Sequence, residues 1–361
     1  TNFGESEIER VVQSMRNKCI SQGRVTEEFE RNLSEFLEVE NVIAVSNGSS
    51  AILIALMAVG ISPGDEVIIP NRTWIATAHA IHILGAKVVI VDVEKDRPII
   101  DASLIEEKVT LKTKAIIPVH MNGRSCDMKV INTIAKKHRL FVIEDAAQAI
   151  ASRNSNGYLG VQSDMGCFSL SVAKTISTGQ GGFVVTNNKD LAVKIRAIRT
   201  QGVESVKDPK EWEMPGFNFR FNDILASIGL EQLKRLPERI KHLRKLYTEY
   251  EKGLKESEFD LIKVDLSIGE VPVYNEFLVR DRSQWIRKLQ NLNIETRPFY
   301  PNISDARYLS KDNASYFNSV KKDNASYFNS VKYSKKGIYL PSGPNQEVKS
   351  ALKCIQYIIG N

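Results

Sequence analysis

The sequence predicts an α/β protein with a large domain on a mainly parallel sheet and a smaller C-terminal α/β domain. Between residues 42 and 187, short apolar runs rich in β-branched residues alternate with stretches of helix length. Unbroken apolar runs are typical of strands buried on both faces, and their alternation with helices indicates parallel βαβ units. The predicted strands are 67–69, 88–91, 115–119, 140–143, 166–170 and 183–185.

The second domain is predicted from a change of pattern late in the chain. Residues 222 to 255 carry apolar side chains at helical spacing, including Ile224, Ile228 and Leu243. A shorter mixed stretch follows Glu258. We therefore divide the chain into residues 1–240, the large domain, and residues 241–361, with a long helix leading into the smaller domain.

An 11-residue unit, KDNASYFNSVK, occurs twice in tandem, at 311–321 and 322–332. Eleven residues make about three turns of helix, so an extra copy keeps the same helix face inward. We interpret the unit as a surface duplication. Because 322–332 leads directly into YSKKGIYLPSG, we take 311–321 as the inserted copy.

Composition excludes several classes of protein. The 361 residues are 42% hydrophobic and 25% charged, as in globular proteins rather than disordered ones. No run of about 18 apolar residues predicts a membrane span, and the polar N-terminus is unlike a signal peptide. The net charge of +6 is spread along the chain, which argues against a nucleic-acid partner. The 4 cysteines form no CxxC pair, so we expect no metal site, no disulfide and a cytoplasmic location.

The first segment that could carry chemistry is VSNGSSA, residues 45–51, which precedes an apolar helix. The N-terminus of a helix offers free backbone N–H groups and a favourable dipole, and here small and hydroxyl residues surround it. Those features can bind a phosphate. The alternative is that the serines only cap a core helix.

The second segment is LFVIEDAAQA, residues 140–149, in which a buried strand ends at Glu144 and Asp145. Carboxylates at the C-terminal end of a parallel strand lie where such sheets bind ligands. Gln148 follows one helical turn later and would face the same way. The alternative for Asp145 is a helix N-cap.

The third segment is FSLSVAKTISTGQGG, residues 168–182, where Lys174 lies among small and hydroxyl residues after a predicted strand. Partial burial lowers the pKa of a lysine and frees its amine as a nucleophile towards an aldehyde. The alternative is a solvated surface lysine. Together, a phosphate seat, a strand-end carboxylate and a lysine are the parts that pyridoxal phosphate requires.

With these segments in view, the sequence resembles the DegT/StrS-type sugar aminotransferases, which are pyridoxal-phosphate enzymes of fold-type I in the aspartate aminotransferase superfamily. The segments that carry the resemblance are FGESEIERV, VSNGSSA, GISPGDEVIIPNRTWIATA, GAKVVIVDV, KTKAIIPVHMNG, IEDAAQA, the Lys174 segment, GFNFRFND and LPSG. The resemblance implies a fold-type I large domain and a homodimer.

The resemblance also implies roles for individual residues. Lys174 would be the catalytic lysine that binds the cofactor as a Schiff base. The implied cofactor contacts are Ser49, Ser50 and Ser169 at the phosphate, Trp74 on the ring face, Asp145 at the ring nitrogen and Gln148 at the ring hydroxyl. Asn218 would reach the phosphate bound to the neighbouring subunit, and Arg220 and Arg297 would lie near the substrate.

The function that the resemblance implies is transfer of an amino group, with L-glutamate as donor, to a keto group of a nucleotide-linked sugar in surface-glycan biosynthesis. A small phosphorylated ketone is the alternative acceptor. A catalytically silent relative that regulates or binds is the alternative from a different class, and the presence of Lys174, Asp145 and Ser169 counts against it.

Overall fold

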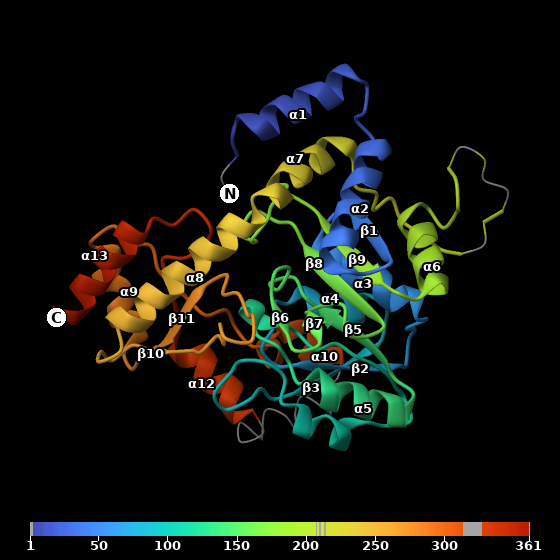
Figure 1. The fold of residues 1–361 in the computed structure, drawn as a ribbon. Helices are drawn as coiled ribbons and strands as arrows, with labels where there is room; N and C mark the ends of the chain where they lie inside the picture. Colours follow the sequence, from blue (N-terminus) through green and yellow to red (C-terminus); the bar gives the residue numbers. More distant parts are fainter. Residues whose placement is uncertain (1–2, 207, 209–210, 213, 313–326, 361) are drawn as a thin grey trace.

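A computed structural model describes residues 3–206, 208, 211–212, 214–312 and 327–360. Its larger domain is built on a seven-stranded sheet with strand order β1-β9-β8-β5-β4-β2-β3 (Figure 1). The strands are β1 (Asn41–Val45), β2 (Glu66–Pro70), β3 (Lys87–Val91), β4 (Thr113–Ile116), β5 (Phe141–Asp145), β8 (Met165–Ser169) and β9 (Gly182–Thr186). All six predicted strands are present, and β1 is an additional one.

The sheet is parallel except around β9, which pairs antiparallel with both β1 and β8. The mainly parallel α/β class predicted from the sequence is therefore confirmed. β5 and β8 are neighbours in the centre of the sheet, with Asp145 opposite Cys167 in the register. Consequently the C-terminal ends of these two strands, which carry Asp145 and Ser169, lie at the same edge.

Helices cover both faces of the sheet because successive strand residues point to opposite sides. Ile43 and Val45 pack in one core with α3 and α6, whereas Val42 and Ala44 pack in another with α2 and α7. The helices of this domain are α1 (Glu5–Arg16), α2 (Arg24–Leu37), α3 (Gly48–Ala58), α4 (Ala76–Ile83), α5 (Met128–His138), α6 (Lys189–Arg199) and α7 (Asp223–Lys234). The hairpin of β6 (Arg153–Asn154) and β7 (Gly157–Tyr158) lies outside the main sheet.

A long helix, α8 (Leu236–Gly253), runs from the large domain to the smaller one (Figure 1). The smaller domain has a four-stranded antiparallel sheet in the order β10-β11-β13-β12. Its elements are β10 (Asp260–Leu261), β11 (Asn275–Leu278), α9 (Arg282–Gln290), β12 (Arg297–Pro298), β13 (Gly337–Leu340) and α13 (Val348–Ile359). Within the described residues, no helix is both long and apolar enough to cross a membrane.

The segment between β12 and β13 returns to the large domain. It contains α10 (Arg307–Asp312) and α12 (Phe328–Lys336), and Ile303, Leu309 and Tyr327 join the core beneath α3 and α4. Ser330 is buried, and both its N–H and its hydroxyl donate to Asp92 at the end of β3. The predicted inserted copy, 311–321, lies almost wholly outside the described residues. In the second half of the other copy, Tyr327 and Ser330 are buried against the large domain, whereas the Phe328 side chain is 71% exposed.

Candidate active site

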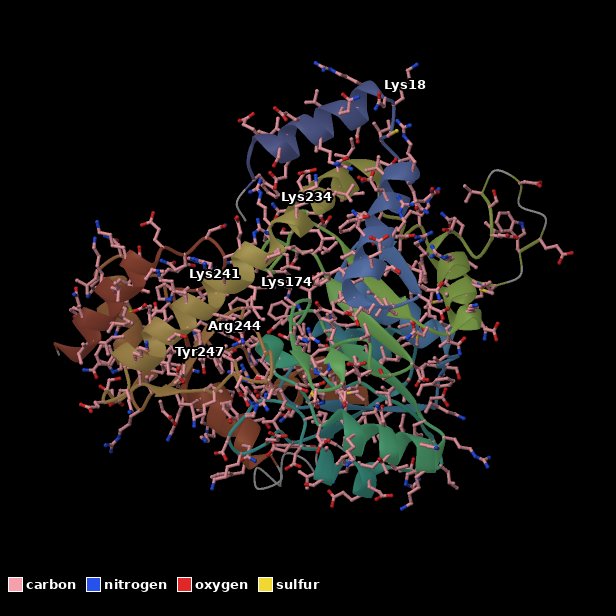
Figure 2. All side chains as sticks on the ribbon, in the orientation of Figure 1. Lys18, Lys174, Lys234, Lys241, Arg244 and Tyr247 are labelled. Carbon is pink, nitrogen blue, oxygen red and sulfur yellow. The ribbon has the colours of Figure 1, made fainter. Side chains whose placement is uncertain are left out.

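A cavity of about 990 Å³ opens at the C-terminal ends of β5 and β8 and is lined by both domains. Of the residues singled out from the sequence, it brings together Ser49, Trp74, Asp145, Gln148, Ser169, Lys174 and Arg297. In Figure 2, Lys174 lies near the middle of the molecule, whereas Lys18 lies at its edge beyond α1. The sequence-based choice of strand-end residues thus converges on one cavity.

Lys174 lies in the loop that follows β8, and its backbone N–H donates to the carbonyl of Ser171 at 3.0 Å. Burial lowers the pKa of the Lys174 amine, and the nearby negative charge of Asp145 acts in the opposite direction. A lysine of lowered pKa has a larger fraction of free amine at neutral pH, which is the nucleophilic form. Lys174 is partly buried and lines the cavity, so its amine is suited to attack an aldehyde bound there.

Asp145 is the last residue of β5, and only 5% of it is exposed. Burial raises the pKa of its carboxyl, while hydrogen bonds from Thr77 and from the backbone of Ala147 lower it. The Thr77 hydroxyl donates to Oδ2 at 2.8 Å, and the Ala147 N–H donates to Oδ1 at 3.2 Å. These donors orient the carboxylate at the cavity wall. Thr77 was not selected as a site residue from the sequence, although it lies only three residues after Trp74.

Glu144 precedes Asp145 but serves a different purpose, because adjacent strand residues face opposite sides. Its carboxylate is fully buried and accepts hydrogen bonds from the backbone of Gly160 and Gln162, each at 2.7 Å. It also pairs with Nε2 of the buried His120 at 2.8 Å. Glu144 thus holds the loop 160–163 against the sheet, and only Asp145 of the two carboxylates lines the cavity.

The proposed phosphate seat lies at the N-terminus of α3. Asn47 caps this helix by accepting from the Ser50 N–H at 2.8 Å, and the Ser50 hydroxyl donates back to the Asn47 carbonyl at 2.9 Å. Ser50 is buried in this capping box and does not line the cavity. Ser49 is exposed and lines the cavity. The placement gives Ser50 the capping role and leaves Ser49 as the hydroxyl available to a phosphate.

Glycine at position 48 lets the helix end approach β8. A Cβ atom at Gly48 would lie 2.8 Å from the Cβ of Ser169, closer than real Cβ contacts. In the part of the chain that the structure describes, the N–H groups of Gly48 and Ser49 have no hydrogen-bond partner. Two free N–H groups and the hydroxyls of Ser49 and Ser169 form a cradle that fits a phosphate.

Trp74 and Gln148 also border the cavity. The Trp74 ring is 59% exposed and meets the Tyr300 ring edge-on, with 5.6 Å between centroids. The side-chain oxygen of Gln148 accepts the backbone N–H of Asn122 at 2.8 Å. Tyr300, which follows β12 and packs against the large-domain core, was not selected as a site residue. Its contact with Trp74 spans more than 200 positions, so no local pattern signals it.

Arg297 and the Asn218–Arg220 pair have different surroundings. Arg297 lines the cavity with a mostly exposed side chain that pairs with Glu295. Asn218 accepts a hydrogen bond from Nε of Arg220 at 2.9 Å, and neither residue lines the cavity of its own chain. The structure therefore does not bring Asn218 and Arg220 together with Lys174 within one chain.

The mainly parallel sheet, with a partly buried lysine in the loop after β8 and a buried carboxylate at the end of β5, defines a pyridoxal-phosphate enzyme of fold-type I. The cradle at Gly48 and the buried carboxylate of Asp145 both fit that cofactor. Residues 1–358 match the DegT/DnrJ/EryC1/StrS aminotransferase family, and the chain belongs to it. The predictions of the family, the cofactor and a pyridoxal-phosphate-dependent aminotransferase are confirmed.

Relatives and solved structures agree with this membership. The chain is 38% identical to the GDP-perosamine synthase of Caulobacter vibrioides over 306 residues, 82% of each protein. It is 34% identical to the spore coat polysaccharide biosynthesis protein SpsC of Bacillus subtilis, covering 70% of this chain and 68% of SpsC. The structure of DesV from S. venezuelae superposes with a TM-score of 0.91 at 27% identity, covering 98% of this chain and 93% of DesV. The structure of NtdA from Bacillus subtilis with bound PMP superposes with a TM-score of 0.88 at 28% identity, covering 99% of this chain and 82% of NtdA.

Proposed function

We propose that this aminotransferase moves an amino group from L-glutamate to a keto group of a nucleotide-linked sugar in surface-glycan biosynthesis. The observation that carries the chemistry is that the partly buried Lys174, whose pKa is lowered, lines the same cavity as the Asp145 carboxylate. The acceptor class is supported by the relatives named GDP-perosamine synthase, at 38% identity in both Caulobacter vibrioides and Escherichia coli O157:H7.

Pyridoxal phosphate, when bound, supplies an electron sink for the carbon that gains or loses the amino group. Lys174 would bind it covalently as a Schiff base and then carry the proton to and from that carbon as a general acid–base. Asp145 would hold a proton on the ring nitrogen, oriented by the hydroxyl of Thr77. Each of these tasks requires a group of fixed position, and Asp145 has one because it ends β5, whereas Lys174 lies in the loop after β8.

The remaining contacts follow from the walls of the cavity. The N-terminus of α3, with Ser49 and Ser169, would hold the phosphate. Trp74 would cover the ring face, and Gln148 would contact the ring hydroxyl. Ser50, which the resemblance places in the phosphate loop, would act indirectly by fixing the start of α3.

The active unit is proposed to be a cytoplasmic homodimer. Asn218 and Arg220 form a pair outside the cavity of their own chain. In a two-fold dimer, Asn218 of one subunit would reach the phosphate in the other subunit, and Arg220 would approach the substrate there. Arg297 would meet the acceptor from within the same chain, because it borders the cavity.

The test is glutamate-dependent amination of a panel of keto sugars linked to GDP and to other nucleotides, read by mass spectrometry. The purified chain carries its cofactor in these assays, and omission of glutamate is the control. Turnover of a nucleotide-linked keto sugar is expected. Turnover of small phosphorylated ketones alone would support the alternative acceptor. Failure of glutamate to change the cofactor's visible absorbance, and of every acceptor to react, would favour the silent relative.

A further inference from the structure

The backbone carbonyls on either side of Lys174 are held by side chains from outside its loop. The Tyr274 hydroxyl donates to the Ala173 carbonyl at 3.1 Å. Nη1 of Arg239 donates to the Thr175 carbonyl at 3.0 Å. Lys174 belongs to no helix or strand, so its backbone position depends on contacts of this kind.

Arg239 is anchored within a buried polar chain that reaches the N-terminal helix. It lies on α8 and donates to the side-chain oxygen of Gln232 at 2.6 Å. The amide nitrogen of Gln232 donates to Glu7 of α1 at 2.6 Å. All three residues are buried. A guanidinium that is fixed by such partners can hold the Thr175 carbonyl with little freedom of movement.

Tyr274 is anchored on the smaller domain, immediately before β11. Its backbone N–H donates to Oδ1 of Asn122 at 2.7 Å, and its carbonyl accepts from Nδ2 of the same residue at 2.9 Å. Its ring contacts Tyr339 of β13 edge-on at 5.4 Å. Burial raises the pKa of Tyr274 to about 12, so its hydroxyl remains a hydrogen-bond donor at neutral pH.

We propose that Tyr274 and Arg239 are positioning residues that bracket Lys174, one from the smaller domain and one from α8, and so set where its amine lies relative to Asp145. The proposal rests on Lys174 being the reacting amine of the proposed function. Tyr274 and Arg239 each hydrogen-bond to a carbonyl next to Lys174. Loss of either hydrogen bond would therefore allow a small displacement of the Lys174 amine. Misplacement by about 1 Å can cost on the order of 10²-fold in rate.

The test compares variants that lose the Tyr274 hydroxyl or the Arg239 guanidinium with matched control variants elsewhere in the chain. The test variants are Tyr274→Phe, Arg239→Met and Arg239→Lys. Tyr333→Phe is the control for the tyrosine, because the Tyr333 hydroxyl donates to the carbonyl of Lys95, away from the cavity. Arg244→Met is the control for the arginine, because Arg244 lies on the same helix and donates to the carbonyl of Leu266 (Figure 2).

Two measurements are made on each folded variant. In the holoenzyme, kcat should fall by about 10- to 100-fold in Tyr274→Phe and Arg239→Met, with a smaller change in KM for glutamate. In the full-length cofactor-free chain, the pH midpoint for reaction of Lys174 with trinitrobenzenesulfonate is followed by peptide mass spectrometry. This midpoint should rise in both variants towards the ordinary lysine value of about 10.4, because a loosened loop admits water to the amine.

Arg239→Lys should recover part of both losses, since lysine keeps a donor for the Thr175 carbonyl. The two controls should match the wild type in kcat and in the labelling midpoint. Test variants that behave like their controls in both measurements would overturn the proposal. If Arg239→Met does not fold, Tyr274→Phe and Arg239→Lys decide the outcome. Absence of amino transfer in the wild type would count against the proposed function, whereas the labelling comparison would still test the bracket.

Discussion

The two walls of the cavity differ in how they are built. The large-domain wall consists of strand ends and the start of a helix, and Asp145 within it is 5% exposed. The small-domain wall includes Tyr274, the end of β13, the two-residue strand β12 and the loop 341–346, and the Arg297 side chain within it is 76% exposed. The first wall is part of the central sheet and the start of α3, whereas the exposed part of the second, at Arg297 and Glu295, is held mainly by an exposed ion pair. We infer that the groups that carry the chemistry lie in the large-domain wall, with Tyr274 positioning one of them, and that the exposed part of the small-domain wall around Arg297 selects the acceptor.

The largest effect is expected from Lys174→Ala, which removes the amine from the large-domain wall. Loss of a positioned acid–base alone costs about 10²- to 10⁴-fold, and loss of the covalent link adds to that. Turnover should fall below detection while the circular dichroism spectrum is unchanged. Lys241→Ala, at an exposed lysine on α8, is the control and should match the wild type (Figure 2). Turnover near that of the control would show that Lys174 is not the catalytic lysine.

Asp145→Asn should come next, because it keeps the shape of the side chain and removes its charge. Without the carboxylate, a protonated ring nitrogen is not stabilised, and kcat should fall by about 10²- to 10⁴-fold while cofactor affinity weakens less. The neighbouring Glu144→Gln is the control. It should lower the free energy of unfolding by about 1–3 kcal/mol and change kcat far less. Equal kinetic effects of the two substitutions would remove the distinction between the two faces of β5.

Mixing inactive subunits tests whether the large-domain wall is completed by a second chain. Lys174→Ala and Asn218→Ala are each expected to be inactive or nearly so as pure dimers. Equal mixing should restore activity to at most about one quarter of the wild type, since half of the dimers would be hybrids with one intact site each. Activity is measured after subunit exchange. A fully active monomer by light scattering would contradict the shared site.

Arg297→Ala tests the small-domain wall and should have a smaller effect. If Arg297 binds the acceptor, KM for the keto sugar should rise by about 10-fold, equivalent to about 1.4 kcal/mol, with kcat little changed. The half-reaction with glutamate, followed by the cofactor's absorbance, should be unaffected. A large fall in the rate of that half-reaction would mean that Arg297 acts in the reaction with glutamate, which would contradict the proposed difference between the two walls.

The smallest effect is expected from removal of one repeat copy. Deletion of 311–321 or of 322–332 yields the same sequence, so the experiment asks whether a single copy suffices. The cofactor content and the dimer should be retained, and Tm should shift by only a few degrees, since loop-length changes cost about 0.6 kcal/mol per doubling. Ser330→Ala should destabilise the protein, because Ser330 is buried against Asp92. Ser319→Ala, at the equivalent position of the copy that we predict to be inserted, is the control, and an equal loss of stability in both variants would contradict that prediction. Loss of folding on deletion would mean that both copies are required.

The sequence alone predicted six of the seven strands of the large sheet and the edge at which the cavity opens. Unbroken, β-branched apolar runs locate β5 and β8, and strand direction in βαβ units then brings Asp145, Ser169 and Lys174 to one edge. These inferences succeed because they depend on neighbours within a few residues along the chain. The order of strands is then limited by the short connections between them.

Only the tertiary structure decided which groups complete the site. The sequence does not show that the Ser50 hydroxyl is used by the helix cap, because Ser49 and Ser50 differ only in the direction they face. Nor does it show that Thr77 meets Asp145, or that Tyr274 and Arg239 flank Lys174, since these partners are separated by 68, 101 and 64 positions from the residues they bond. Contacts at such separations depend on how helices and domains pack, and the spacing of residues along the sequence does not predict them.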